Sequence, residues 1–143
     1  MAAGMNAPLY TIEILRLAGS LPDAAALGRV DGRSEQRAPT CGSSVLTKVQ
    51  VDGGRVTALS QAVRACAFGQ ASAALVARHA VGRSGQEISD ALSGLAAWLD
   101  GSDGYPAGWG LEALAPARSR KSRHGAILLP FRTLLAAVEQ AKA

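Results

Sequence analysis

The chain has 143 residues, of which 48% are hydrophobic and 18% are charged. This composition excludes an intrinsically disordered protein, and the length fits one domain, residues 1–143, with a core of its own. The formal net charge of +4 supports acidic partners only weakly.

The N-terminal segment and the cysteine content predict a cytoplasmic protein with free thiols. Two cysteines are too few for a disulfide-rich scaffold. Residues 1–21 do not resemble a signal peptide, because no basic residue precedes Arg16 and Glu13 interrupts the apolar run. No uncharged apolar run approaches the roughly 18 residues that span a bilayer. We therefore expect no membrane association.

The first elements in the chain are a predicted helix and a predicted long loop. Residues 9–18 are mostly apolar, follow Pro8 and end before Gly19, an arrangement that is typical of a short helix. Residues 22–40 are rich in Asp, Gly, Arg, Ser and Gln and predict a loop that leads into Cys41. Loops of this length in compact domains are usually functional or mobile.

A β-hairpin follows. Residues 45–52 alternate apolar and polar side chains, the period of a half-buried strand. Asp52-Gly53-Gly54 is a hairpin turn signal, so residues 55–60 should return antiparallel. Residues 61–65 either extend that strand or form a third short one.

Two helices are predicted next. The alanine-rich segment after Cys66 favours a helix to about Val81. Ser84 and Glu87 match the S-x-x-E capping box, and apolar residues continue at helical spacing to Leu99.

The C-terminal part predicts a loop, a basic run and a last helix. Residues 100–109 are rich in Gly, Asp and Pro and predict a loop, and residues 111–115 predict a short turn before Pro116. The basic run 118–124 precedes an apolar stripe over residues 127–138, in which Pro130 should cost a backbone bond or add a small kink. The order of a helix, a hairpin and three helices implies an α+β fold.

Few residues are left to carry chemistry. The chain has no phosphate-loop, dinucleotide, zincin, hydrolase or CxxC motif. Cys41 and Cys66, together with His124 at the start of the last helix, are the candidates for a site. Cys66 would cap a helix, where unpaired N–H groups and the helix dipole favour a thiolate; the alternative is a small buried hydrophobe. His79 has the pattern of a surface or packing residue.

The basic run has three interpretations: a solvated loop, a docking site for an acidic protein, and a nucleic-acid contact. Nucleic-acid binding usually adds interleaved aromatic side chains or a reading helix, and the sequence has neither. We therefore expect no nucleic-acid partner.

Together these residues resemble the iron–sulfur cluster assembly scaffold family, the IscU, NifU N-terminal and SufU type. The family has a Cys-Gly-Asp motif after an N-terminal helix and a loop, a second cysteine that opens a helix of the Cys-x-x-x-x-Ala-Ser type, and a third cysteine before the last helix. Cys41-Gly42 stands at the first motif, Cys66 and Ala71-Ser72 at the second, and His124 where some members carry a histidine before the third. The resemblance implies a small antiparallel three-stranded sheet packed against four to five helices.

Two positions depart from the family pattern. Ser43 stands in place of the aspartate, and Gly125 stands in place of the third cysteine. The implied ligand set is then Cys41, Cys66 and His124. Two thiolates and one imidazole suit either zinc with an open fourth position or a transient [2Fe–2S] cluster.

The resemblance implies a binding and assembly protein rather than an enzyme, one that holds iron or a transient cluster and passes it to recipient apo-proteins. A sulfur acceptor for a cysteine desulfurase is the first alternative, and a zinc-binding regulatory relative that docks on partners through residues 118–123 is the second. We expect a monomer or a weak homodimer.

Overall fold

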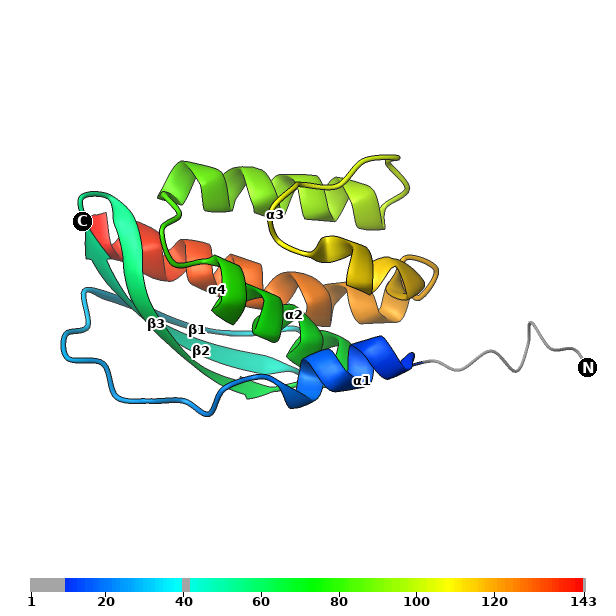
Figure 1. The fold of residues 1–143 in the computed structure, drawn as a ribbon, viewed down its shortest axis with the longest axis horizontal. Helices are drawn as coiled ribbons and strands as arrows, with labels where there is room; N and C mark the ends of the chain where they lie inside the picture. The colour runs from blue at the N-terminus through cyan, green and yellow to red at the C-terminus, as the bar shows by residue number, and fades with distance from the viewer. Residues whose placement is uncertain (1–9, 40–41, 143) are drawn as a thin grey trace, which may run out of the picture.

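The computed structural model describes residues 10–39 and 42–142 (Figure 1). They form an α+β fold with one three-stranded antiparallel sheet, which confirms the expected fold class. The elements in chain order are α1 (Ile12–Gly19), β1 (Gly32–Arg37), β2 (Ser44–Asp52), β3 (Arg55–Arg64), α2 (Ala67–His79), α3 (Gly85–Leu99), the 3₁₀ segments η2 (Leu111–Ala117) and η3 (Lys121–Arg123), and α4 (His124–Lys142).

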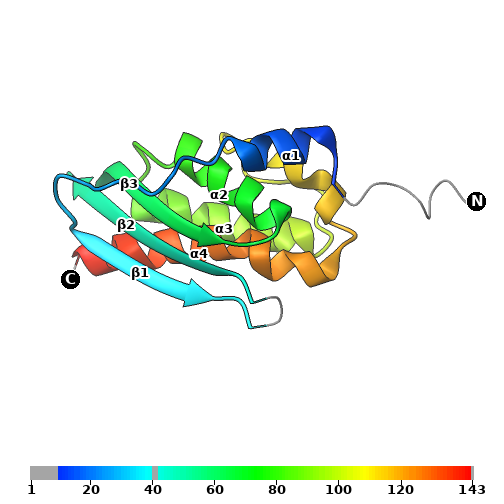
Figure 2. The same cartoon turned by 90° about the horizontal axis from the view of Figure 1, so that it is seen from below.

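The helices form two layers on one face of the sheet (Figures 1 and 2). α4 packs on β1 and β2, and α2 packs on β3 and α4. α3 lies outside them against α4, and α1 lies against α2. No helix in the described part of the chain is long and apolar enough to cross a membrane.

The predicted hairpin of β2 and β3 is confirmed. The strands pair antiparallel from Ser44↔Arg64 to Asp52↔Arg55, around the positive-φ glycines Gly53 and Gly54. β3 is continuous to Arg64, so residues 61–64 extend the strand and no separate strand forms there.

The third strand, β1, corrects the prediction of an unbroken loop over residues 22–40. It pairs antiparallel with β2, with Gly32 opposite Val49 and Arg37 opposite Ser44. Gly32 lies so close to α4 that a Cβ there would clash with the backbone of Ala137. The side chains of β1 do not alternate between apolar and polar, because even the positions that face the core are small or polar. Pairing with β2 places this segment in the sheet.

The start of α3 is predicted correctly, whereas α1 begins at Ile12 and not at residue 9, because Thr11 is its N-cap. Thr11 caps α1 by accepting from the Ile14 N–H, and Ser84 and Glu87 form the complete capping box of α3. Pro130 lies inside α4 and has no N–H to donate to the Ala126 carbonyl four residues earlier.

Candidate functional site

Cys66 lies at the N-terminal end of α2. It is the N-cap residue, with extended backbone angles (φ −66°, ψ 173°), and its half-buried side chain makes no capping hydrogen bond. Among the described residues its thiol is free. The first-turn N–H groups of α2 and the positive end of its helix dipole face this position.

His124 is the first residue of α4. Its Nε2 atom lies 3.0 Å from the Ala117 carbonyl oxygen and 3.1 Å from that of Arg118. Both oxygens are acceptors, so Nε2 carries the proton, and in the neutral ring Nδ1 keeps the lone pair. Metal-binding histidines are commonly held in this way by a backbone carbonyl on the nitrogen that does not bind the metal.

The first turns of α2 and α4 pack against each other and bring the two residues to one end of the molecule. A Cβ at Gly69 would lie 3.4 Å from Ala126 Cβ and 3.3 Å from the Ala126 carbonyl oxygen, which Pro130 leaves without its helical donor. One turn further on, the Ser72 hydroxyl donates to the Ile127 carbonyl at 2.6 Å. A Cβ at Gly69 would also lie 2.6 Å from Ala65 Cβ, so this glycine makes room both for Ala65 before the helix and for the first turn of α4.

Cys41 lies outside the described residues. The residues on either side of it form a turn at the same end of the sheet: Ala38 N–H donates to Ser43 O at 2.9 Å, and Gly42 N–H donates to Ala38 O at 3.1 Å. Within the described ranges no group of three or more His, Cys, Asp and Glu side chains could hold a metal ion. Of the three predicted ligands, the structure therefore describes two, Cys66 and His124.

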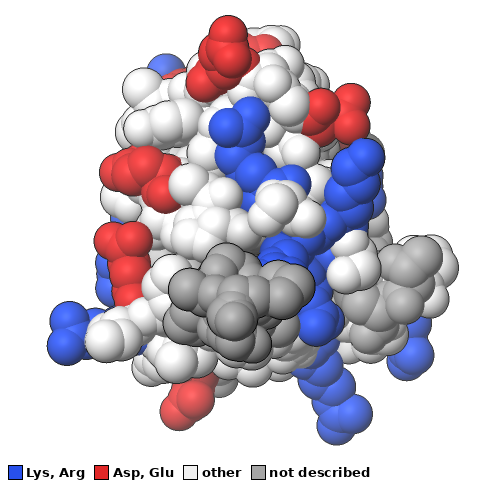
Figure 3. Space-filling model, turned by 90° about the vertical axis from the view of Figure 1, so that its right-hand side faces the viewer, with Lys and Arg blue, Asp and Glu red and all other residues white. Residues whose placement is uncertain are grey.

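The basic run is divided between a structural residue and exposed ones. Arg118 stacks on the Trp98 ring, 5.0 Å from its centroid, and donates to the carbonyls of Trp98 and Ser102. Arg120 and Lys121 are exposed, and η3 orders the run as a 3₁₀ turn directly before His124. Lys and Arg gather across the centre of this end of the molecule (Figure 3).

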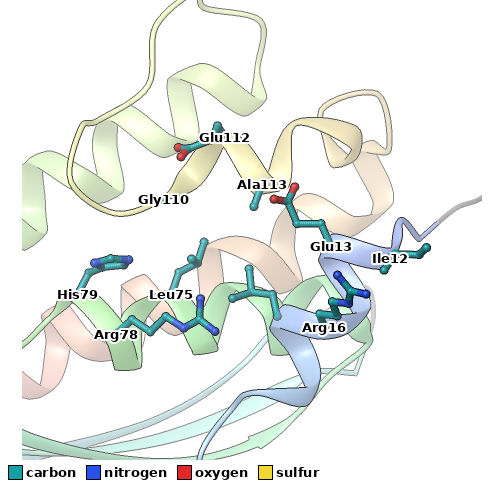
Figure 4. A pocket seen from close by; sticks show the side chains of 10 residues that line it. Ile12, Glu13, Arg16, Leu75, Arg78, His79, Gly110, Glu112 and Ala113 are labelled. Carbon is teal, nitrogen blue, oxygen red and sulfur yellow. The ribbon is translucent and has the colours of Figure 1, made fainter.

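His79 ends α2, about 20 Å along the helix axis from Cys66. It does not belong to the predicted site. Instead it lines a groove of about 590 Å³ between α1, α2 and η2, where Glu13, Arg16, Arg78 and Glu112 are also found (Figure 4). No local sequence motif marks this groove, because its side chains come from three separate segments of the chain.

Comparison with solved structures gives relatives over nearly the whole chain, whereas no protein-family model and no curated protein matches. The N-terminal part of a nitrogen-fixing NifU-like protein from Brucella abortus superposes with a TM-score of 0.87 at 29% identity, covering 94% of each chain. A putative iron–sulfur cluster assembly scaffold protein for the SUF system from Fervidobacterium islandicum gives a TM-score of 0.79 at 18% identity, covering 91% of this chain and 96% of that one.

Both likenesses agree with the fold that the sequence resemblance implies. The NifU-like structure is similar to this chain in both sequence and structure, whereas the SUF-system structure shows a shared fold alone. The resemblance to the iron–sulfur cluster assembly scaffold family is therefore confirmed in the fold, which this chain shares with a NifU-like and a SufU structure.

Proposed function

We propose that this chain is an iron–sulfur cluster assembly protein that binds iron or a transient [2Fe–2S] cluster through Cys41, Cys66 and His124. The observation that carries the proposal is the packing of the α2 start against the α4 start, which puts an uncapped cysteine and a carbonyl-anchored histidine at the same end of the fold. The scaffold-like fold supports the same function.

The chemistry of these donors fits an iron or zinc cargo. Thiolate sulfur and imidazole nitrogen bind both iron–sulfur clusters and zinc. With the Nε2 proton of His124 held by two carbonyls, Nδ1 is the atom that would bind the metal. Since Gly125 offers no ligand in place of the family's third cysteine, a fourth position stays open to water or to an incoming ligand from a recipient protein. An open position favours release, which a scaffold requires.

Anaerobic reconstitution with ferrous iron and sulfide tests the proposal. The parent protein should develop a visible chromophore, and Cys66→Ala and Cys41→Ala should not. His124→Ala should lower the yield or shift the absorption, whereas the matched control His79→Ala should behave as the parent because His79 lies at the far end of α2. Cysteine variants that reconstitute as well as the parent would refute the proposal.

Replacing Gly125 by cysteine gives a gain-of-function test. Gly125 lies in α4 and is not among the described positive-φ glycines, so a side chain is tolerated by its backbone. A thiolate there would restore the family's third cysteine. Gly125→Cys protein should hold the reconstituted cluster longer against a chelator than the parent, and an unchanged lifetime would argue against a cluster at this end.

A second candidate function, sulfur acceptance from a cysteine desulfurase, is favoured by the uncapped position of Cys66 at a helix start. The Cys66 thiolate would attack the terminal sulfur of the desulfurase persulfide. The S–S bond breaks, the desulfurase cysteine leaves as a thiolate, and Cys66 becomes the persulfide. Mass spectrometry after incubation with a desulfurase and cysteine should then show one added sulfur on Cys66, without any need for metal.

Metal analysis of freshly purified protein separates these functions from a zinc-binding relative. Zinc bound at one equivalent, lost in Cys66→Ala, with no chromophore on reconstitution, would favour a regulatory protein that docks through the exposed residues of the basic run. Iron, or no metal together with sulfur transfer, would favour the two assembly functions.

A further inference from the structure

The groove between α1, α2 and η2 is separate from the cysteine end and has no part in the function proposed above. Its volume of about 590 Å³ lies within the range of small-molecule pockets, roughly 300–1,000 Å³. Leu17, Leu75 and Ala113 form a buried apolar floor. Neither Cys66 nor His124 lines it.

The rims of the groove carry opposite charges. In Figure 4 the carboxylates of Glu13 and Glu112 lie along the side next to η2, and the guanidinium groups of Arg16 and Arg78 lie along the opposite side. Arg78 donates to the Ser20 hydroxyl at 2.9 Å, which holds it in place without neutralising it. No ion pair joins any two of these side chains in the described ranges.

Gly110 keeps one end of the groove clear. Its φ of +71° is a backbone conformation that favours glycine. A Cβ at this position would lie 3.2 Å from Leu75 Cδ2 and 3.5 Å from His79 Nε2, so any side chain would intrude on the floor beside the imidazole. The space at this end of the groove is open because residue 110 has no side chain.

We propose that this groove binds a zwitterionic small molecule of short-peptide size, with an aliphatic part on the apolar floor. A ligand ammonium would pair with Glu13 and Glu112, and a ligand carboxylate with Arg16 and Arg78. Arginine guanidinium groups suit this carboxylate because they present paired N–H donors. A ligand of one sign would meet repulsion from one rim, whereas a zwitterion is attracted by both.

Titration of ¹⁵N-labelled, metal-free protein with the tripeptide glycyl-leucyl-glycine tests the proposal by NMR. Saturable shifts should appear in the amides of α1, of the second half of α2 and of η2. The N-acetylated and the C-amidated tripeptides each lack one charge and should bind about tenfold more weakly or worse. Cys66→Ala protein should bind the tripeptide as the parent does, so this proposal and the proposed function fail independently.

The variant Glu13→Gln/Glu112→Gln should lose the preference for the free over the acetylated N-terminus and keep the preference for the free carboxylate. Glu35→Gln/Glu139→Gln is the matched control, since it removes two exposed carboxylates that do not line the groove. Shifts that do not saturate by about 10 mM peptide would overturn the proposal, because such binding is weaker than a specific pocket gives. Equal affinity for the capped peptides, or shifts confined to the cysteine end, would overturn it as well.

Discussion

Two helices that follow each other in the chain begin in opposite ways. At the start of α3 the Ser84 hydroxyl accepts from the Glu87 N–H at 3.2 Å, and the Glu87 carboxylate accepts from the Ser84 N–H at 3.2 Å. Arg55 also donates to that carboxylate at 2.7 Å. At the start of α2, Cys66 has the same extended N-cap conformation, but its side chain bonds to no backbone N–H.

The difference separates a capped helix start from one that leaves a thiol at the uncapped position. The capping box of α3 satisfies two N–H groups that have no partner within the helix, and each such bond contributes about 1 kcal/mol. α2 does without this contribution, and the positive helix end acts on a thiol instead. We infer that Cys66 is kept at a cost in stability.

Replacing Cys66 by serine should separate stability from function most clearly. Serine is a preferred N-cap residue, and its hydroxyl can accept from the first-turn N–H groups of α2, so the free energy of unfolding should rise by up to about 1 kcal/mol. The same variant has no thiolate and should lose cluster reconstitution and sulfur acceptance completely. Urea denaturation and the reconstitution assay measure the two effects.

Cys66→Ala is the control for this variant, because alanine removes the thiol without offering an acceptor to the helix. It should lose function as the serine variant does, but it should be the less stable of the two. If the serine variant is no more stable than the alanine variant, Cys66 does not occupy a position where a cap is missing, and the comparison of the two helix starts fails.

Replacing Ser84 by alanine is the reverse experiment on α3. It removes the hydroxyl of the capping box and should lower the free energy of unfolding by about 1 kcal/mol. Ser93→Ala, at an exposed position within the same helix, should change stability far less, since alanine is the better helix former there. The urea midpoint should fall at unchanged slope; equal effects of the two substitutions would contradict the capping role.

The parts of the fold with local signals could be predicted from the sequence. The Ser84 capping box, the Asp52-Gly53-Gly54 turn and the change of period at Cys66 each depend on residues a few positions apart. The same holds for the His124 position, which the order of motifs placed at the start of the last helix and which the structure confirms.

The parts of the fold that depend on contacts between distant segments could not be predicted from the sequence. β1 has no apolar alternation and is a strand because β2 pairs with it and because Gly32 admits the α4 backbone. Arg118 was predicted only as part of a basic run, although it stacks on Trp98 and is held by carbonyls far away in the sequence. The charged groove had no signal at all, because three helical segments meet there.

The smallest expected effect is the pH dependence of the capping box. Two hydrogen bonds lower the pKa of Glu87 from its ordinary value of 4.5. The larger effect comes from the Ser84 N–H, which donates to the carboxylate, and the next from the Arg55 guanidinium. A carboxyl whose pKa is lower in the folded state stabilises the fold above its unfolded pKa, and this contribution is lost as the pH falls through the folded value. Parent protein should therefore melt above Glu87→Gln at pH 7, and the gap should narrow as the pH falls below 4.5 and close once it has passed the lower folded pKa. Glu139→Gln, an exposed carboxyl on another helix, should follow the parent throughout. A gap between parent and Glu87→Gln that does not change with pH would mean that α3 depends on the shape of this side chain and not on its charge.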